Sequence, residues 1–329
     1  MALDVRETRM NQTSYGFCLF PSQPVMGVSR PVLAKLRRLA SRCLDERRRY
    51  VARNERRAIE KILSSPGQPR NYDSEVVFRQ LQAAYSSRNN YRYDSYSTWR
   101  RGAERAEDIL HNNVELREIG RNVLEVGCGD GMTGLALSGY GHCVTLLDAE
   151  DWRDDRVKRL PFAKADLCGR LPFNSESFDL VYSFNTLEHA SDPAAALGEL
   201  RRVCKKGGLV FSDFGPLYWS PWGLHAYRSL HMPYPQYLFS DSFIENKLAE
   251  LGIFDLGKKR TELQPLNKWR VHEFRRLWGD SGYDVITLME SKEREHLGVI
   301  KAFSRAFSGR GLTFDDVATK NIRVVLRRV

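Results

Sequence analysis

Apolar and polar positions along the middle of the chain follow patterns that predict strands alternating with helices. Short runs rich in β-branched and other apolar residues predict strands at 123–126, 143–147, 177–185 and 208–214. Residues 194–203 carry apolar positions at helical spacing, and Asp192 and Pro193 supply an N-cap and a first-turn proline. The lysines and glycines at 205–208 predict the end of that helix. This alternation predicts an α/β fold with a mostly parallel sheet.

Helical patterns also precede and follow this stretch. Residues 72–112 predict two helices. Residues 271–280 predict one more, and the strands 283–290 and 321–326 come after it. Near the N-terminus, residues 31–63 carry apolar residues at three- and four-residue spacing, which predicts a further amphipathic helical segment.

The breaker Ser-Ser-Pro-Gly-Gln-Pro at 64–69 divides the chain. We expect a basic, partly helical extension over residues 1–70 and a second domain over residues 71–329. Within the second domain, residues 215–270 form an insertion that is rich in aromatic residues and has four prolines between 216 and 235. Irregular stretches of this length in a compact domain are usually functional, so we expect the insertion to contribute to a binding site.

A glycine-rich turn follows the first predicted strand. The sequence Gly-Cys-Gly-Asp-Gly at 127–131 separates that strand from a helix start at Met132. A strand, a glycine turn and a helix are the layout of a nucleotide-binding βα unit, because glycine permits a sharp turn and the helix N-terminus presents free N–H groups. A dinucleotide fingerprint is not met, since Met132 occupies one of its positions, and no P-loop lysine follows.

Three further features give this turn a family resemblance. Glu125 stands two residues before the first glycine, Phe-Asp-Leu-Val occupies 178–181, and Leu-Glu-His-x-x-Asp-Pro occupies 187–193. These motifs resemble those of the class I methyltransferases that depend on S-adenosylmethionine (SAM), and closely those of the type 11 branch. The resemblance covers residues 120–215 by motif and 270–329 by topology only. It implies an enzyme that uses SAM, with a Rossmann-like fold, a seven-stranded, mostly parallel sheet, helices on both faces and an added N-terminal helical extension.

The residues predicted to bind the cofactor lie at strand ends and in the glycine turn. Asp148 ends the second strand, where its two oxygens can accept both hydroxyls of a ribose; capping of the next segment is the alternative. By the resemblance, Asp166 accepts from the adenine amino group, although it also suits a surface turn. The predicted cofactor-binding residues are Glu125, Gly127, Cys128, Gly129, Asp148, Asp166, Leu167 and Asn185. The aromatic residues Tyr91, Tyr93, Tyr96 and Trp99 would cover the cofactor or serve as core residues.

Methyl transfer to a hydroxyl requires removal of its proton, and histidine suits that role near neutral pH. Of the seven histidines, we predict His225, in the insertion, as the catalytic base and His189, at the end of the fourth strand, as the alternate. A structural role is the competing interpretation for both. No metal site is expected, because His225 and His231 have no nearby pair of carboxylates in the sequence.

The insertion suggests the kind of methyl acceptor. Aromatic faces pack against apolar ring faces, while histidines and tyrosines can bond hydroxyls, so we expect a small or medium polar acceptor such as a sugar, a glycan or another hydroxyl-bearing metabolite. In the family that the chain resembles, the segment after the fifth strand overhangs the acceptor. Two alternatives stay open: RNA methylation with an arginine-rich helix holding phosphates, and a non-catalytic SAM-fold binding protein.

The net charge of +10 is concentrated at one end, because residues 1–70 contribute +9 of it. The arginines of 31–63 form either a solvated helix face or a contact for an anionic surface such as lipid headgroups. The chain has no apolar run of 18 residues and no signal-peptide pattern at its N-terminus. We therefore expect no transmembrane segment and a cytoplasmic protein, with peripheral membrane contact as a variant of that location.

Overall fold

The computed structural model describes residues 49–87, 92–112, 121–255 and 258–329. The chain divides into two compact units, one made of Met1–Arg70 with Leu297–Phe314 and the other of Asn71–His296 with Asp315–Val329. The predicted domain boundary at residue 70 stays a prediction. No helix in the described ranges is long and apolar enough to cross a membrane.

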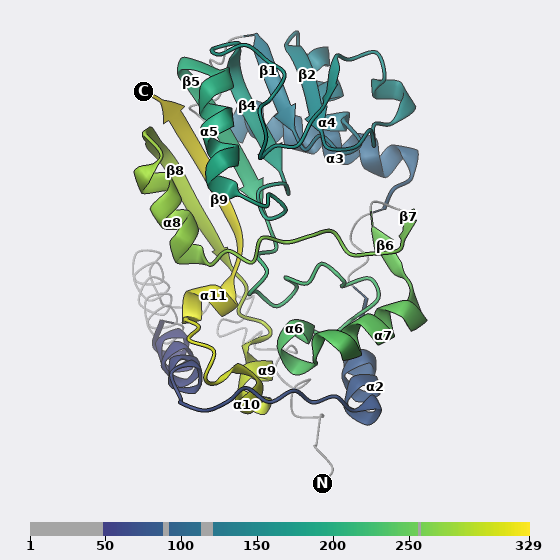
Figure 1. Cartoon of the computed structure of the whole chain (residues 1–329), viewed down its shortest axis with the longest axis vertical. Helices are drawn as coiled ribbons and strands as arrows, with labels where there is room; N and C mark the ends of the chain where they lie inside the picture. Colours follow the sequence, from purple (N-terminus) through teal and green to yellow (C-terminus); the bar gives the residue numbers. More distant parts are fainter. Residues whose placement is uncertain (1–48, 88–91, 113–120, 256–257) are drawn as a thin grey trace, which may run out of the picture. The chain divides into compact units, whose positions relative to one another are not determined.

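A seven-stranded sheet forms the centre of the larger unit, in the order β3–β2–β1–β4–β5–β9–β8 (Figure 1). Its strands are β1 (Asn122–Val126), β2 (Cys143–Asp148), β3 (Phe162–Lys164), β4 (Phe178–Phe184), β5 (Cys204–Phe214), β8 (Tyr283–Lys292) and β9 (Thr319–Arg328). The strands β1 to β5 pair in parallel, whereas β9 is antiparallel to both β5 and β8. This topology confirms the predicted Rossmann-like fold.

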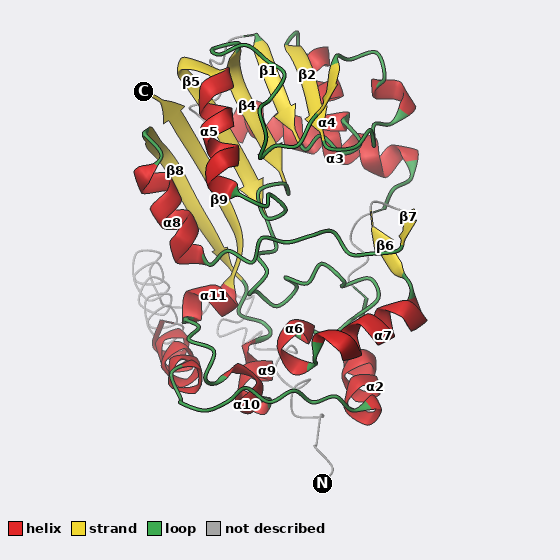
Figure 2. Cartoon of the chain, in the orientation of Figure 1, coloured by secondary structure: helices red, strands yellow, loops and turns green. Residues whose placement is uncertain are grey.

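Helices cover both faces of the sheet (Figure 2). They are α3 (Ser95–Glu107), α4 (Met132–Gly139), α5 (Pro193–Val203) and α8 (Val271–Asp280). Leu200 of α5 and Phe274 of α8 share one buried cluster with Leu124 of β1. Leu137 of α4 lies in a second cluster with Val123, the preceding residue of β1. Successive side chains of a strand point to opposite faces, so β1 contributes to two separate core layers.

The two helices predicted for residues 72–112 are α2 (Glu75–Ala84) and α3, which continues into a π-helical turn at Asp108–Asn112. Side-chain oxygens begin both helices: Ser74 accepts from the Val77 amide and Asp94 from the Ser97 amide. These helices therefore follow the local sequence signals closely.

The helix predicted over 194–203 does end at Val203, but residues 205–208 do not cap it as predicted. Helix α5 ends at Val203, and β5 already begins at Cys204. Cys204 pairs with Phe178 of β4, but the next paired residues are Leu209 and Leu180, so the register shifts between them. Residues 205–208 are the extra residues of this irregularity in the strand, and they do not cap the helix.

The insertion at 215–270 contains regular elements as well as irregular chain. These are α6 (Pro235–Leu238), α7 (Asp241–Leu251) and the two-stranded sheet of β6 (Ile253–Asp255) and β7 (Lys258–Arg260). The Tyr234 hydroxyl donates to the Val317 carbonyl and the Tyr237 hydroxyl to the Trp219 carbonyl, and both rings are fully buried. Part of the aromatic content of the insertion is therefore used in buried packing, including against Val317 outside the insertion.

The smaller unit combines a helix at residues 49–63 with α9 (Leu297–Ala302) and α10 (Ser304–Phe307). The Gly309 amide donates to the Ser65 carbonyl at 3.0 Å, which ties the two segments together. In the described part of the basic segment, Ile59 and Leu63 are buried. The arginines Arg49, Arg53, Arg56 and Arg57 are exposed. The remainder of the helix predicted for 31–63 lies outside the described residues.

Candidate active site

A cavity of about 600 Å³ opens where β1, β2 and β4 end. Val126, Leu147 and Phe184 contribute to its wall from these three strands. Because β1 pairs with β2 on one side and β4 on the other, the order of the strands reverses at this point. Ligands of open α/β sheets bind at the carboxyl ends of the strands beside such a reversal.

The glycine turn lines one side of this cavity. Gly127 and Gly129 adopt left-handed φ angles of 64° and 53°. The Gly129 amide donates to the Asp148 carboxylate at 2.9 Å, and the Cys128 amide donates to the Leu147 carbonyl at 3.1 Å. The turn is therefore fixed to the end of β2, and the cavity lies over its backbone.

Two glycines of this turn differ in what surrounds them, which leads to a prediction. A Cβ at Gly127 would collide with the Thr186 side chain, whereas a Cβ at Gly129 would meet nothing within 4 Å. We expect Gly127→Ala to lower the free energy of unfolding by about 2–4 kcal/mol, from left-handed strain and overpacking together. Gly129→Ala introduces the backbone strain without a collision, so it should lower the free energy of unfolding by only about 1 kcal/mol. Urea unfolding of both variants checks this, and equal losses would contradict the assigned collision.

Glu125 lies behind the turn and does not line the cavity. Its side chain is 3% exposed, and its Oε2 accepts from the Gly134 amide in the first turn of α4 at 2.9 Å. Burial raises the pKa of Glu125 to about 8, against the lowering effects of Arg105 and the Gly134 amide. The geometry shows Glu125 holding α4 to the end of β1.

The other predicted cofactor residues all line the cavity, namely Gly127, Cys128, Gly129, Asp148, Asp166, Leu167 and Asn185. Burial raises the pKa of Asp148, and its hydrogen bond from the Gly129 amide opposes this effect. Asp166 accepts from the Cys168 amide at 2.9 Å. Asn185 has a left-handed φ of 51°, an uncommon conformation that turns the chain at the end of β4.

Of the four aromatic residues expected to cover the cofactor, Tyr93 lines the cavity. Tyr96 and Trp99 are 65% and 51% exposed and do not line it, so that expectation is wrong for both. Tyr91 lies outside the described residues. The buried face of α3 is formed instead by the smaller side chains of Thr98, Gly102 and Ala106.

Several cavity residues escaped the sequence analysis because they come from separate parts of the fold. They are Arg101 and Arg105 of α3, Trp152, Arg260 of β7, and Lys320 of β9. Arg101 pairs with Asp130 at 2.7 Å, and the Arg105 guanidinium lies 4.6 Å from the centre of the Phe184 ring. No motif in the sequence marks these residues, and only the tertiary fold brings them together.

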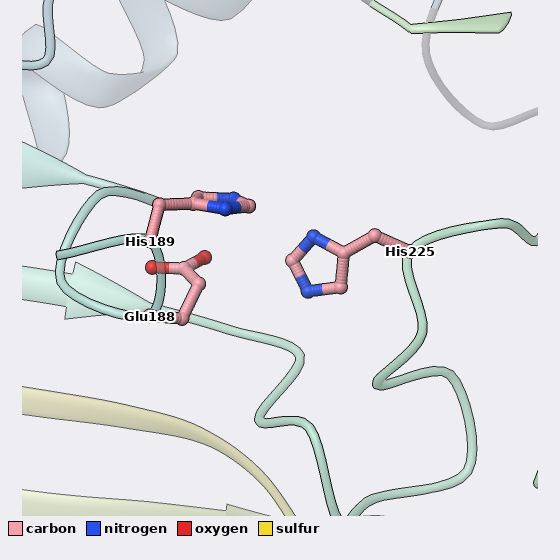
Figure 3. A group of neighbouring side chains, drawn as sticks. All are labelled: Glu188, His189 and His225. Carbon is pink, nitrogen blue, oxygen red and sulfur yellow. The ribbon is translucent and has the colours of Figure 1, made fainter. Parts of the chain in front are cut away.

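Glu188, His189 and His225 converge beside the cavity (Figure 3). Both histidines line it. Their rings are 5.0 Å apart and nearly perpendicular. Glu188, 2% exposed, accepts from the Gly215 amide with Oε1 at 3.0 Å. The sequence placed Glu188 and His189 in one motif, but nothing in it paired them with His225.

Backbone carbonyls fix the orientation of both rings. His189 bonds the Pro265 carbonyl through Nδ1 at 2.8 Å, and His225 bonds the Pro216 carbonyl through Nε2 at 2.7 Å. A carbonyl only accepts, so these two nitrogens carry hydrogen, and in the neutral rings Nε2 of His189 and Nδ1 of His225 carry the lone pairs. Burial lowers the pKa of His225 to about 3, and the nearby His189 adds to this effect. The ring of His225 is therefore neutral at neutral pH.

His231, the other histidine of the insertion considered in the sequence, does not line the cavity. Its backbone amide donates to the Gln82 side chain at 2.9 Å, which ties the insertion to α2. His231 therefore serves below as a comparison for His225.

Comparison with known proteins agrees with this geometry. A methyltransferase-domain family model matches residues 124–212. A malonyl-[acyl-carrier protein] O-methyltransferase of Paenibacillus sp. (strain JDR-2) is 22% identical over 239 residues, 68% of this chain and 78% of that protein. The corresponding enzyme of Halorhodospira halophila is 31% identical over 46% of this chain and 52% of its own length. A sterol 24-C-methyltransferase of Pneumocystis carinii is 33% identical over 33% of this chain and 31% of its own.

Solved structures with a similar chain path include the PH0226 protein of Pyrococcus horikoshii OT3, with 16% identity, a TM-score of 0.42 and coverage of 78% of this chain and 100% of that one. A SAM-dependent methyltransferase of Mesorhizobium loti has 21% identity and a TM-score of 0.39, over 64% of this chain and 93% of that one.

The strand order, the glycine turn and the cavity above it define a Rossmann-like fold with a cavity where such folds bind their ligands. The family match over residues 124–212, together with this geometry, supports a class I SAM-dependent methyltransferase. This confirms the family resemblance, the enzyme class and the cofactor SAM that the sequence motifs indicated. It also sets aside the non-catalytic binding protein.

Proposed function

We propose that the enzyme transfers the methyl group of SAM to an oxygen of a small or medium polar acceptor, such as a hydroxyl of a sugar, a glycan or another metabolite. The observation that carries this proposal is the group of Glu188, His189 and His225 at the cavity that the predicted cofactor residues also line. A buried carboxylate beside two partly buried imidazoles suits an acceptor that must lose a proton.

The residues present fit SAM. A Cβ built on Gly129 would meet nothing within 4 Å, so the space over the turn is open, as a ligand lying across it requires. In this proposal Asp148 accepts the ribose hydroxyls, Asp166 and Leu167 lie beside the adenine, and the turn amides face the rest of the cofactor. When bound, SAM supplies an electrophilic methyl group on a sulfonium, so the protein's task is to orient the acceptor and exclude water.

Asp148→Ala is expected to weaken SAM binding by about 1–3 kcal/mol, because two charge-assisted hydrogen bonds to the ribose would be lost. Titration calorimetry with SAM measures this directly. Asp151→Ala is the matched control: Asp151 lies three residues further on, pairs with Arg153 at the surface and does not line the cavity. Equal SAM affinity in Asp148→Ala and the wild type would remove Asp148 from the cofactor site.

At the acceptor end, the lone pairs of the two histidines are available to a hydroxyl. Nδ1 of His225 is the proposed proton acceptor and Nε2 of His189 the alternate. Trp222 and Tyr227 line the same cavity and supply flat faces for a ring-shaped acceptor. The names of the relatives include both an O- and a C-methyltransferase, so the choice of oxygen rests on this polar group.

The acceptor class can be tested with SAM labelled in its methyl group. The enzyme is incubated with fractionated polar metabolites, glycans and RNA, and labelled products are identified by mass spectrometry. We expect label on an oxygen of a small polar compound, and none with Asp148→Ala at limiting SAM. Label confined to RNA would overturn the proposal in favour of RNA methylation.

The exposed Arg49, Arg53, Arg56 and Arg57 are consistent with contact at an anionic surface, and this contact is part of the proposal for the smaller unit. If this surface is a membrane, the protein would be cytoplasmic and peripherally bound to that membrane. Deletion of residues 1–63 that leaves binding to anionic liposomes unchanged would remove this part of the proposal.

A further inference from the structure

The three side chains beside the cavity carry the atom types of a metal site, although the sequence predicted none. Their candidate ligand atoms, one from each of Glu188, His189 and His225, all lie within 4.8 Å of one another (Figure 3). Ligand bonds of about 2.0–2.2 Å place donors about 3–4 Å apart, so atoms within 4.8 Å of one another are near the spacing of a ligand set. The sequence missed the set because His225 lies 36 residues after His189, in the insertion.

Both histidines are held as metal ligands usually are. A metal-bound imidazole donates its other ring N–H to a carbonyl or carboxylate, which fixes the ring and its tautomer. Here the Pro265 and Pro216 carbonyls accept from His189 and His225 at 2.8 and 2.7 Å. The two remaining nitrogens carry lone pairs, as an ion requires.

Glu188 supplies an independent observation. Its Oε1 is satisfied by the Gly215 amide, but its Oε2 is buried and has no hydrogen-bond partner among the described residues. A buried carboxylate oxygen left unpaired is costly, and a cation among the three side chains would satisfy it.

We infer that Glu188, His189 and His225 bind a divalent transition-metal cation that activates the methyl acceptor. Two imidazoles and one carboxylate with open positions are a common ligand set for such ions, Zn²⁺ and Fe²⁺ among them. The inference rests on the proposed oxygen acceptor. With the ion bound, His189 and His225 are its ligands, and the cation takes over from them the activation of the acceptor. The cation polarises the acceptor hydroxyl, whose proton passes to solvent. The oxygen then forms a bond to the methyl carbon, and the electron pair of the broken S–C bond stays on sulfur, giving S-adenosylhomocysteine.

Metal binding is tested without any acceptor. The full chain, made without a histidine tag and dialysed against a chelator, is titrated with Co²⁺ and followed by visible absorption and calorimetry. We expect one Co²⁺ per chain, displaced by Zn²⁺. Glu188→Gln and His225→Ala should each weaken Co²⁺ binding by at least about 100-fold. Two variants are used, with circular dichroism to confirm folding, because Glu188 is buried.

A second cluster in the same unit, Glu293, Glu295 and His296, provides the matched control. Glu295→Gln removes one of its candidate ligands at an exposed position. We expect Glu295→Gln to bind Co²⁺ like the wild type. Loss of the bound ion in Glu295→Gln but not in Glu188→Gln or His225→Ala would overturn the inference, as would the absence of stoichiometric binding.

Activity separates this inference from the proposed function. Methyl transfer to a hydroxyl that persists after the metal is removed would overturn the metal site and leave the oxygen acceptor standing. Stoichiometric Co²⁺ binding that depends on His225 would support the metal site even if labelled SAM identified an acceptor without a hydroxyl, and in that case the proposed function would fail alone.

Discussion

Turnover is expected to fall by about 10²–10⁴-fold when His225 is replaced by alanine, the usual effect of removing a group that handles a proton in the transition state. His225 presents Nδ1 beside His189 at the cavity, and its other nitrogen is held by the Pro216 carbonyl. SAM affinity should stay within about twofold, since the predicted cofactor residues belong to the ends of β1, β2, β3 and β4 and His225 belongs to the insertion. Steady-state kinetics and SAM calorimetry on one preparation measure both quantities.

His231→Ala is the control for this experiment. His231 comes from the same insertion but does not line the cavity, so its replacement should leave kcat and the SAM affinity nearly unchanged. If His225→Ala keeps normal turnover, His225 has no part in the reaction. If it loses SAM binding or unfolds at a lower temperature than His231→Ala, its role is structural.

Stability should decrease with rising pH because of Glu125, and Glu125→Gln should remove this decrease. Burial raises the pKa of Glu125 from its ordinary 4.5 to about 8 in the folded chain. The native state therefore binds the proton more tightly than the unfolded chain does. The stabilising contribution of the protonated form is complete below pH 4.5 and is lost as the pH rises through 8. The difference between the two pKa values corresponds to a loss of up to about 5 kcal/mol in the free energy of unfolding.

Urea unfolding at pH 5, 7 and 9 measures this effect. Between pH 5 and 9, the free energy of unfolding of the wild type should fall by several kcal/mol more than that of Glu125→Gln, because glutamine cannot ionise. Glu150→Gln, at an exposed carboxylate, should follow the wild type. Parallel curves for the wild type and Glu125→Gln would show that Glu125 is ionised in the folded protein.

Much of the fold was predictable because short, local sequence patterns indicate where its strands and helices begin and end. Strands β1, β2 and β4 are short apolar runs bounded by turn residues, and Asp192 accepts from the Ala194 and Ala195 amides at the start of α5, as its position before Pro193 predicted. The role of residues 205–208, just after α5, was not predictable in this way. Lysine and glycine at 205–208 are typical of a helix end, but pairing of Cys204 with Phe178 in the sheet overrides that signal.

The position of the predicted cofactor residues has a similar reason. Each lies at or just after the carboxyl end of a strand, and parallel strands bring these ends to one edge. Glu125 is the instructive exception: it lies within β1, so its side chain points behind the turn, to α4. Residues such as Arg105 and Arg260 reach the same cavity from a helix and from the insertion, and no strand-end rule finds them.

The sequence by itself determined the sheet, the glycine turn and the family, because these depend on local periodicity and on motifs a few residues long. Only the tertiary structure decided the chemistry at the acceptor end. Glu188 and His189 are neighbours in one motif, whereas His225 reaches them through an insertion whose path is set by buried contacts such as Tyr234 with Val317. A contact between distant segments depends on how the chain between them packs. The spacing of the residues in the sequence does not predict that packing.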